Sequence, residues 1–454
     1  MTAFQANTFR LSDLHSAHLQ LLQARLGHLL GASGFESVLL HSGRPARIAG
    51  DDQDYPFHSG ARFRHWVPLT DVPDCFLLVV PGRRPLLVFH QPSDYWHLPA
   101  PLPDTWWSDA YDIVPVADLE GARRTLPADL SHTAFVGEPF PELSAWGVAA
   151  INPAPLLTRM DFDRAWKSPY ELHCLREASR RAVRGHRAAL DAWQSGRSEL
   201  GIQLAYLEAV GQRESAMPYN NIVALNEHSA VLHYQRLDRE APAERRSFLI
   251  DAGAEYGGYA SDITRTYAAT DGDFAALVAG MDEVQQSLAA SVRAGIDWRD
   301  VHISAHRHVA ELLQDSGVIL CDVDEAVETG VSGVFLPHGV GHLLGLQVHD
   351  AGGLLGSADG QEIPRPQGHP NLRLTRILEE GFVVTMEPGL YFIEPLLAQA
   401  RSDTRARHID WARIETLKPY GGIRIEDDLA VTRGGSENLT RDAFAGIERA
   451  DPGA

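Results

Sequence analysis

Leucine residues recur at helical spacing over residues 12–30, and two short apolar runs, SVLLHSG and FLLVVPG, follow further along the chain. An apolar residue at every third or fourth position predicts an amphipathic helix, whereas a short, unbroken apolar run that ends at glycine predicts a buried strand. This order of elements predicts an α/β module in the N-terminal part of the chain.

The pattern changes near residue 158. Proline is frequent just before this point, and a long helical pattern, YELHCLREASRRAVRGHRAAL, begins after Ser168-Pro169. Proline interrupts regular elements and is favoured in the first turn of a helix. A chain of 454 residues is also long enough for two hydrophobic cores. We therefore expect two domains, residues 1–158 and residues 159–454.

Four β-rich runs occur in the second half of the chain, each bounded by glycine or proline: SFLIDAG, YASDITRTYA, FVVTMEPGLY and GIRIEDDLAVT. The Gly257-Gly258 pair between the first two runs is typical of a hairpin turn. Strands that are joined by hairpins form antiparallel or mixed sheets, unlike the parallel sheet of a doubly wound domain. Because two helical stretches precede these strands, we expect the second domain to be α+β.

Charge and composition exclude several classes of partner. The formal charge is −20, and the arginines between Arg176 and Arg187 alternate with apolar residues, which is typical of a solvated helix face. We therefore expect neither nucleic acid nor a membrane as a partner. Because the N-terminus lacks the features of a signal peptide and no apolar run reaches the length of a membrane span, we expect a cytoplasmic protein.

Acidic residues stand inside the apolar runs of the second half. Asp251 ends one predicted strand and Asp262 lies in the next, so that the hairpin brings the two carboxylates together, and Glu387 and Glu426 lie in two further strands. A single acid in a strand is most often a salt-bridged or edge residue, but four such acids are harder to explain separately. Since converging carboxylates repel one another, divalent cations are their natural compensation.

Three histidines, His338, His342 and His349, lie within the glycine-rich run PHGVGHLLGLQVHD. Glycine permits close approach of the backbone, and imidazole is a common metal ligand. The spacing does not tell which of the three binds a metal. Carboxylate oxygens with one imidazole and no thiolate favour manganese, cobalt or iron, with zinc as an alternative. Such a centre suits metal-assisted hydrolysis.

Longer runs of the chain resemble a known family. The runs YNNIVALNEHSAVLHY, DAGAEYGGYASDITRT, PHGVGHLLGLQVHD, LRLTR, TMEPGLYFIEPLL and GGIRIEDD are similar to those of the bacterial Xaa-Pro dipeptidases, or prolidases, of the pita-bread metallopeptidase family. The organophosphorus acid anhydrolases of the same subfamily are equally similar. The resemblance implies that the second domain has the pita-bread fold, a curved antiparallel or mixed sheet flanked by helices.

The resemblance also implies a centre with two divalent metal ions per subunit, manganese in the first place. Asp251 would bind one ion, His342 and Glu387 the other, and Asp262 and Glu426 would bridge the pair. All five positions carry the residues that the family uses as ligands. This argues against relatives that act without metals, and against a scaffold that only binds.

Catalytic and substrate-binding roles follow from the same resemblance. His338 and His349 would orient the substrate and handle protons, Arg424 would orient Glu426, and Glu387 would relay a proton to the departing proline nitrogen. The expected substrate-binding residues are Tyr219, His233 and, for the C-terminal carboxylate of the substrate, Arg373.

Two N-terminal residues, Asp52 and Trp96, stand in segments that reach the neighbouring subunit's active site in relatives. The resemblance therefore implies a homodimer whose N-terminal domain serves dimerisation and forms a lid over the pocket.

The implied reaction is the hydrolysis of small peptides, the Xaa-Pro dipeptides, by a hydroxide that bridges two metal ions. A side activity on organophosphorus triesters or fluorophosphates fits the same machinery. The alternative is an aminopeptidase P, which removes the first residue from longer Xaa-Pro peptides with the same metal ligands.

Overall fold

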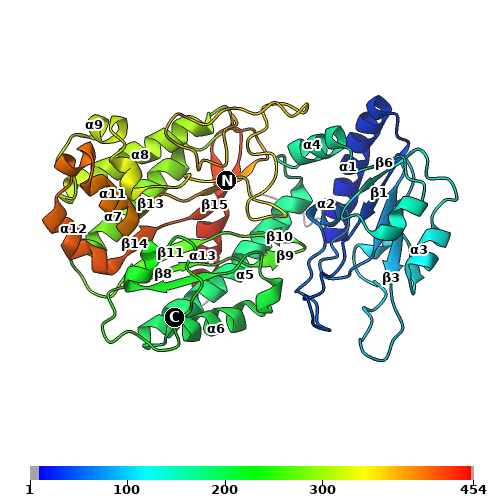
Figure 1. Cartoon of the computed structure of the whole chain (residues 1–454), viewed down its shortest axis with the longest axis horizontal. Coiled ribbons are helices and arrows are strands. Elements are labelled where there is room, and N and C mark those ends of the chain that lie inside the picture. The colour runs from blue at the N-terminus through cyan, green and yellow to red at the C-terminus, as the bar shows by residue number, and fades with distance from the viewer. Residues whose placement is uncertain (1–9, 451–454) are drawn as a thin grey trace, which may run out of the picture. The chain divides into compact units, whose positions relative to one another are not determined.

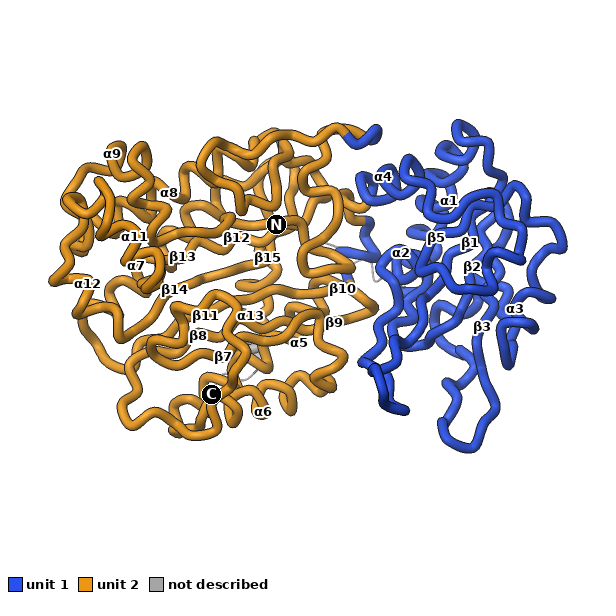
Figure 2. The backbone as a smooth tube through the Cα atoms, viewed as in Figure 1, with its two compact units in different colours: residues 1–163, 168–173, 358–360 blue, residues 164–167, 174–357, 361–454 orange. Residues whose placement is uncertain are grey.

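The computed structural model describes residues 10–450, which divide into two compact units (Figures 1 and 2). Within this range, unit 1 contains the residues up to Asp163 together with Ser168–His173 and Ala358–Gly360, and unit 2 contains Arg164–Lys167, Cys174–Ser357 and the residues from Gln361 onward. The domain limits expected at residue 158 stay a prediction.

Unit 1 is built on a six-stranded mixed sheet. Its strands are β1 (Ser37–His41), β2 (Phe76–Val79), β3 (Leu86–His90), β4 (Asp112–Val116), β5 (Thr133–Val136) and β6 (Ala150–Ile151). They lie in the order β4-β3-β2-β1-β5-β6. The pairs β1–β2 and β2–β3 are antiparallel, and the other three pairs are parallel. The apolar runs SVLLHSG and FLLVVPG are thus strands, as expected, and the structure shows that they are neighbours.

Both faces of this sheet are covered, which explains why its central strands are apolar at every position. Val38 and Leu40 of β1 belong to a cluster with leucines of helix α1 (Leu11–Ser33), whereas Leu39 belongs to a second cluster with residues of α3 (Leu119–Thr125). Side chains alternate between the faces of a strand, so each face buries its own set. Full burial of one such side chain contributes about 1.5–3 kcal/mol.

The remaining helices of unit 1 are short. They are α2 (Ala61–Arg64), α4 (Ala154–Asp163) and the 3-10 helices η1 (Ser108–Ala110) and η2 (Pro141–Ala145). The long helix expected after Ser168-Pro169 is α5 (Pro169–Gln194), whose first turn belongs to unit 1 and whose remainder belongs to unit 2.

In the described part of the chain, unit 2 contains four small antiparallel sheets. Their strands are β7 (Ile222–Leu225), β8 (Ser247–Asp251), β9 (Glu255–Tyr256), β10 (Tyr259–Ala260), β11 (Thr264–Ala268), β12 (Val383–Met386), β13 (Gly389–Tyr391), β14 (Gly422–Arg424), β15 (Asp427–Val431) and β16 (Ser436–Asn438). The sheets have the orders β11-β8-β7, β12-β15-β16, β10-β9 and β13-β14. An isolated bridge between Thr264 and Glu426 links the β8–β11 region to the chain between β14 and β15. The antiparallel or mixed sheet expected for this part of the chain is confirmed.

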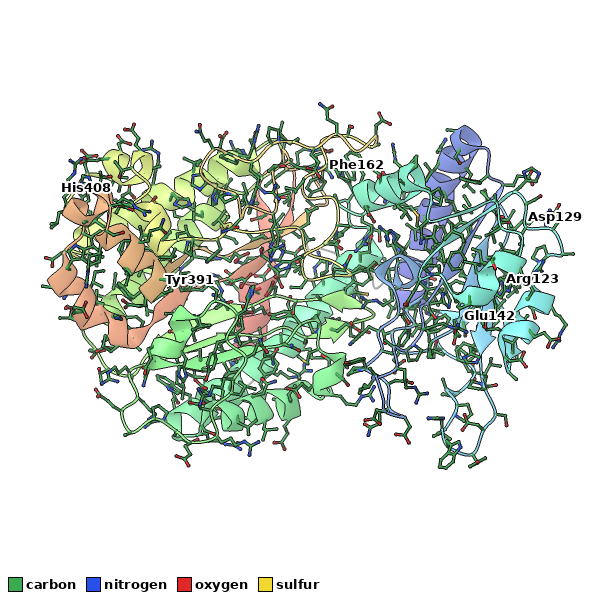
Figure 3. All side chains as sticks on the ribbon, viewed as in Figure 1. Arg123, Asp129, Glu142, Phe162, Tyr391 and His408 are labelled. Carbon is green, nitrogen blue, oxygen red and sulfur yellow. The ribbon has the colours of Figure 1, made fainter. Side chains whose placement is uncertain are left out.

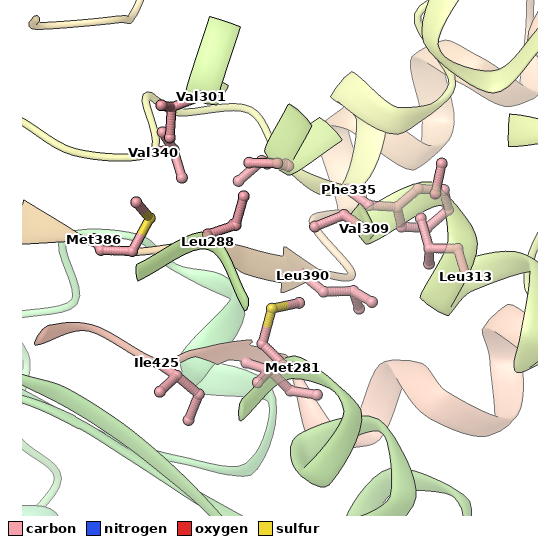
Figure 4. Packing of buried hydrophobic residues seen from close by; sticks show 14 of the residues in the cluster. Met281, Leu288, Val301, Val309, Leu313, Phe335, Val340, Met386, Leu390 and Ile425 are labelled. Atoms are coloured by element: carbon pink, nitrogen blue, oxygen red, sulfur yellow. The ribbon is translucent and has the colours of Figure 1, made fainter. Parts of the chain in front are cut away.

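Helices pack against these strands to form the core of unit 2. They are α6 (Glu199–Val210), α7 (Asp273–Ser291), α8 (Trp298–Asp315), α9 (Val323–Glu328), α10 (Ser332–Phe335), α11 (Glu394–Arg401), α12 (Trp411–Leu417), α13 (Leu439–Ala450) and the 3-10 helices η3 (Glu214–Ala216), η4 (Asn226–Ala230), η5 (Thr404–His408) and η6 (Lys418–Tyr420). Met386, Leu390 and Ile425 from the strand region cluster with Met281 of α7 and Val309 of α8 (Figure 4). Among residues 10–450, no helix has both the length and the apolar character of a membrane span.

The expectation that all four acids lie in strands was wrong for three of them. Asp251 ends β8, but Asp262 lies between β10 and β11, Glu387 follows β12, and Glu426 lies between β14 and β15. Each of the three runs that contain Asp262, Glu387 and Glu426 is therefore two strands with a break. At a break the chain leaves the regular hydrogen-bond ladder of the sheet. The direction of the carboxylate side chain then no longer follows from the alternation of side chains along a strand.

Candidate active site

A cavity of about 830 Å³ opens in unit 2. Most of the site residues expected from the sequence line its wall: His233, Asp251, Asp262, His338, His342, His349, Arg373, Glu387, Arg424 and Glu426. Segments far apart in the sequence therefore meet here, because the breaks after β8, β12 and β14 lie close together across the sheets.

Asp251, at the end of β8, is held by two hydrogen-bond donors. The Tyr219 hydroxyl donates to its Oδ1 at 2.8 Å, and Arg424 Nη2 donates to its Oδ2 at 2.6 Å. Burial raises the pKa of this carboxyl and the nearby Asp262 raises it further, against the opposing effect of Arg424. Tyr219 is not among the residues that line the cavity, but its hydrogen bond to Asp251 connects it to the site.

Asp262 is buried beside His342. Its Oδ2 lies 3.4 Å from His342 Nε2, and its backbone N–H donates to the carboxylate of Asp428 at 3.1 Å. Burial raises the pKa of the Asp262 carboxyl, but the hydrogen bond and charge of His342 outweigh it and the net pKa is lowered. Gly253 allows the two acidic segments to approach, because a Cβ at this position would overlap the carbonyl oxygen of Ser261.

His342 has one nitrogen engaged with the backbone and the other directed to the acids. Its Nδ1 lies 3.0 Å from the carbonyl oxygen of Leu343 and donates to it, so that Nε2 is the nitrogen left to face the acids. Burial alone lowers the pKa of His342, but hydrogen bonding to Asp262 and the charges of Glu387 and Asp262 outweigh it and the net pKa is raised. Nε2 lies 3.5 Å from Glu387 Oε1. The Thr385 hydroxyl accepts the His342 backbone N–H at 3.1 Å and lies 3.4 Å from Glu387 Oε1. Burial raises the pKa of Glu387 to about 7.

Glu426 is 2% exposed and completes the acidic cluster. The Thr264 hydroxyl donates to its Oε2 at 2.5 Å, and its backbone N–H donates to the carbonyl of Thr264 at 3.0 Å. Burial and the neighbouring carboxylates, Asp262 first, raise its pKa well above the usual value. Asp262, His342 and Glu426 each place a donor atom within 4.8 Å of the others.

His338 lies beside Glu387, with 3.6 Å between its Nδ1 and Glu387 Oε2, and it contacts Tyr391. Its Nδ1 lies 2.8 Å from the carbonyl of Gly339, and its Nε2 lies 2.9 Å from the hydroxyl of Tyr391, which Figure 3 labels. Burial lowers the pKa of His338 to about 4, and the positive charge of Arg424 adds to this. His338 is therefore neutral at pH 7.

The other expected residues are placed differently. The His349 ring lies edge-on to that of His342, with 4.5 Å between centroids. His349, His233 and Arg373 are all exposed residues on the cavity wall. Asp52 and Trp96 are exposed residues of unit 1, and Trp96 is 75% exposed.

Sequence reasoning assigned no role to two residues that shape the site. Tyr391 connects Arg424 to His338, and Asp428 fixes the backbone of Asp262. Both stand in runs already conspicuous for their acids, TMEPGLY and IEDD, but nothing in their spacing shows which groups they contact.

A further buried acid supports the loop that carries His349. Asp350 accepts a hydrogen bond from Lys167 Nζ at 2.9 Å and one from Arg164. These two positive charges lower its pKa despite its burial. A buried carboxylate with two cationic partners is a strong anchor, so the backbone beside His349 is well fixed.

The donor set fits divalent metal ions. Buried carboxylates close to one another are unstable as free anions, and cations between them remove the repulsion. In its neutral form His342 adds one nitrogen donor, Nε2, and none of the three cysteines, all of them described residues, lines the cavity. Fold and site together define a metal-dependent hydrolase.

The chain belongs to metallopeptidase family M24, whose family model matches residues 173–433. A second family model, Xaa-Pro dipeptidase, N-terminal domain, matches residues 13–162. The expected membership of this family and the expected enzymatic activity are thereby confirmed.

Relatives cover nearly the whole chain. An Xaa-Pro dipeptidase of Xanthomonas axonopodis pv. citri (strain 306) is 49% identical over 436 residues, which are 96% of this chain and 98% of the relative. An Xaa-Pro dipeptidase of Stenotrophomonas maltophilia (strain K279a) is 48% identical over 433 residues, which are 95% of this chain and 97% of the relative.

Solved structures confirm the fold. Aminopeptidase P from E. coli with the inhibitor Pro-Leu aligns with a TM-score of 0.71 at 22% identity and covers 96% of this chain and 99% of that structure. Proline aminopeptidase P II from Yersinia pestis aligns with a TM-score of 0.67 at 23% identity, over 94% and 96% of the two chains. The expected pita-bread architecture is therefore the observed one.

Proposed function

We propose that this protein hydrolyses dipeptides with proline in the second position, in a metal-dependent reaction. The observation that carries the proposal is the convergence of four carboxylates and His342 on one cavity in a chain that is 48–49% identical to Xaa-Pro dipeptidases along nearly its full length. The fit of the donor set to divalent cations supports the same conclusion.

The acid cluster would hold two divalent ions. Asp251 would bind one ion, His342 and Glu387 would bind the other, and Asp262 and Glu426 would serve both. When bound, such ions activate water and polarise the carbonyl of the scissile bond. Manganese is the proposed ion, with cobalt, zinc or iron as alternatives, because oxygen donors predominate.

The side chains around the ions orient the peptide and move protons. The guanidinium group of Arg373, exposed on the cavity wall, pairs with the substrate's C-terminal carboxylate. Glu387 transfers a proton to the proline nitrogen as the bond breaks. Neutral His338 lies beside Glu387, with 3.6 Å between its Nδ1 and Glu387 Oε2, and from this position it orients the substrate and handles protons.

Other groups complete the pocket. His233 contacts the peptide near the scissile bond, and His349 orients the substrate on the side of His342. Tyr219 and Arg424 hold Asp251 in its rotamer through the two hydrogen bonds described above.

The homodimer implied by the sequence stays part of the proposal. Trp96 lies in a loop with two other exposed apolar residues, Tyr95 at 86% and Leu98 at 98% exposure. Exposed apolar groups in one segment are typical of a contact surface. We assign Trp96 and Asp52 to the neighbouring subunit's pocket; the cytoplasmic location likewise stays a prediction.

A matched pair of peptides tests the function. The manganese-loaded enzyme is expected to cleave Ala-Pro much faster than Ala-Pro-Ala, because a longer substrate carries its carboxylate beyond the reach of Arg373. Faster cleavage of the tripeptide would establish the aminopeptidase P alternative instead. Inertness toward both peptides after manganese addition would refute peptide hydrolysis.

A further inference from the structure

Three histidines of unit 2 form a second cluster, distinct from the acid centre. His302 and His306 lie one turn apart on α8, and His369 comes from the loop that precedes β12. The ring centroids lie 4.8 Å apart for the helix pair and 4.6 Å from each of these to His369. One ring nitrogen from each residue lies within 4.8 Å of the other two.

The ring nitrogens of this cluster are poorly satisfied by the protein itself. His302 Nε2 and His369 Nδ1 face each other at 2.9 Å, and His306 Nδ1 lies 3.0 Å from the Ser332 hydroxyl. His306 Nε2 and His302 Nδ1 have no hydrogen-bond partner among the described residues, although both side chains are 1% exposed. Buried polar atoms normally have partners, and a ligand bound among the three rings would supply one for His306 Nε2.

Burial favours the neutral form of the three rings, in which each ring has one N–H and one lone pair. The contact between His302 Nε2 and His369 Nδ1 uses one of these protons and one of these lone pairs. Burial lowers the pKa of His302 to about 2 and that of His306 to about 3, and the proximity of the other rings adds to both shifts. Burial also lowers the pKa of His369. A metal ion bound by both His302 Nε2 and His369 Nδ1 would displace the proton that they share.

We propose that His302, His306 and His369 bind one zinc ion, outside the peptidase centre. Zinc accepts three imidazoles with a fourth position left for water, and two ligands one helical turn apart are a common way to build such a site. Two nitrogens of a tetrahedral zinc site lie about 3.3 Å apart for bonds of about 2.0 Å, so the 2.9 Å between His302 and His369 needs little adjustment. The Ser332 hydrogen bond holds His306 with Nε2 free.

The position of His369 gives this ion a structural consequence. The loop of His369 continues to Asn371 and then to Arg373, which lies on the cavity wall. The Asn371 side chain donates to the carbonyl of Pro337 at 2.9 Å. Zinc would therefore fasten the Arg373-bearing loop to α8. Such an ion stabilises the folded chain and limits the motion of one wall of the cavity.

Zinc content at saturation tests the proposal. Full-length wild-type protein is dialysed against excess zinc and then against metal-free buffer, and bound zinc is counted by plasma mass spectrometry. His306→Gln keeps a polar partner for Ser332 but removes the ligand, and it is expected to hold one zinc ion per subunit fewer than wild type. His308→Gln is the matched control, because His308 lies on the same helix, paired with Glu311, outside the cluster.

Two further measurements make the result unambiguous. Asp262→Asn disrupts the peptidase centre and is expected to keep the zinc of the histidine cluster. Loss of metal from one site can therefore be distinguished from loss of metal from the other. Crystals of wild-type protein with zinc are expected to show an anomalous peak between the three rings at the zinc edge. Equal zinc content in His306→Gln and wild type, or no peak between the rings, would overturn the proposal even if a variant fails to fold.

Discussion

Arg424 and Tyr391 are joined by a hydrogen bond from Nη1 of the guanidinium group to the tyrosine hydroxyl, with 2.7 Å between the atoms. Because the hydroxyl accepts this bond, its own proton is free to be donated to His338 Nε2 at 2.9 Å. The other arm of Arg424 holds Asp251. A chain of contacts therefore runs from Asp251, a proposed metal ligand, through Arg424 and Tyr391 to His338.

Removal of the tyrosine hydroxyl is expected to impair the reaction without loss of metal. In Tyr391→Phe, His338 loses the donor that fixes its ring, and kcat for Ala-Pro should fall about tenfold, as expected for one hydrogen bond of about 1–1.5 kcal/mol. Metal content should stay at the wild-type level. Tyr420→Phe is the control, because Tyr420 stacks on Phe274 and lies apart from the acids. An unchanged kcat in Tyr391→Phe would show that the chain of contacts is not used.

Neighbouring acids should behave in opposite ways. Glu426 faces the acid cluster, whereas Asp427, the next residue, pairs with Arg265 and Arg441 at 2.7 Å each. Glu426→Gln is expected to lose bound metal and to lower kcat by about 100-fold or more, since ligand removal disables the centre. Metal analysis and steady-state kinetics measure both effects.

Asp427→Asn is expected to keep metal but to lose stability. Removal of one charge from a buried ion pair leaves the partner uncompensated and costs about 3 kcal/mol in unfolding free energy, which urea titration measures. If fully folded Asp427→Asn also lost its metal, the assignment of metal binding to Glu426 and of a structural role to Asp427 would be wrong.

The sequence was sufficient for the elements and for the chemistry of the acids. Apolar runs predicted β1 and β2, and carboxylates in apolar surroundings predicted metal ions before any family was considered. The sequence did not show that Asp262, Glu387 and Glu426 stand at breaks in strands. A break depends on which partner strands end nearby, and that is decided by tertiary contacts rather than by local alternation.

Contacts between distant side chains were also beyond sequence reasoning. Tyr391 and Arg424 are 33 positions apart, and His302 and His369 are 67 apart. Residue type limits what such groups can bind, but only the fold decides which of them meet. The choice of His342 over its two neighbours required the family resemblance for the same reason, and the geometry adds that its Nε2 is the atom that faces the acids.

Arg373 should determine the preference for short substrates. In Arg373→Ala, KM for Ala-Pro is expected to rise about 10- to 100-fold with little change in kcat, because a charged hydrogen bond to the substrate carboxylate is lost. Ala-Pro amide, which lacks that carboxylate, serves as the control substrate and should show the same KM with wild type and variant. An equal rise in KM for the amide would mean that the substitution disturbs the cavity wall in general.

Buried neutral histidines should make the metal-free protein sensitive to acid. His186 is fully buried, its Nε2 donates to the carbonyl of Ala252 at 2.9 Å, and burial lowers its pKa to about 3. The unfolded chain binds a proton at this residue below pH about 6.5, whereas the folded chain does so only near pH 3. Stability is therefore complete above pH 6.5 and is lost as pH falls from 6.5 toward 3.

At pH 5 the loss from His186 alone amounts to about 2 kcal/mol, since one pKa unit corresponds to about 1.4 kcal/mol. Urea unfolding of the EDTA-treated protein at pH 7 and pH 5 measures it. In His186→Gln the difference between the two pH values should shrink by about that amount, while His28→Gln, at an exposed position of α1, should leave it as in wild type. An undiminished pH dependence in His186→Gln would mean that the acid sensitivity originates in other buried groups.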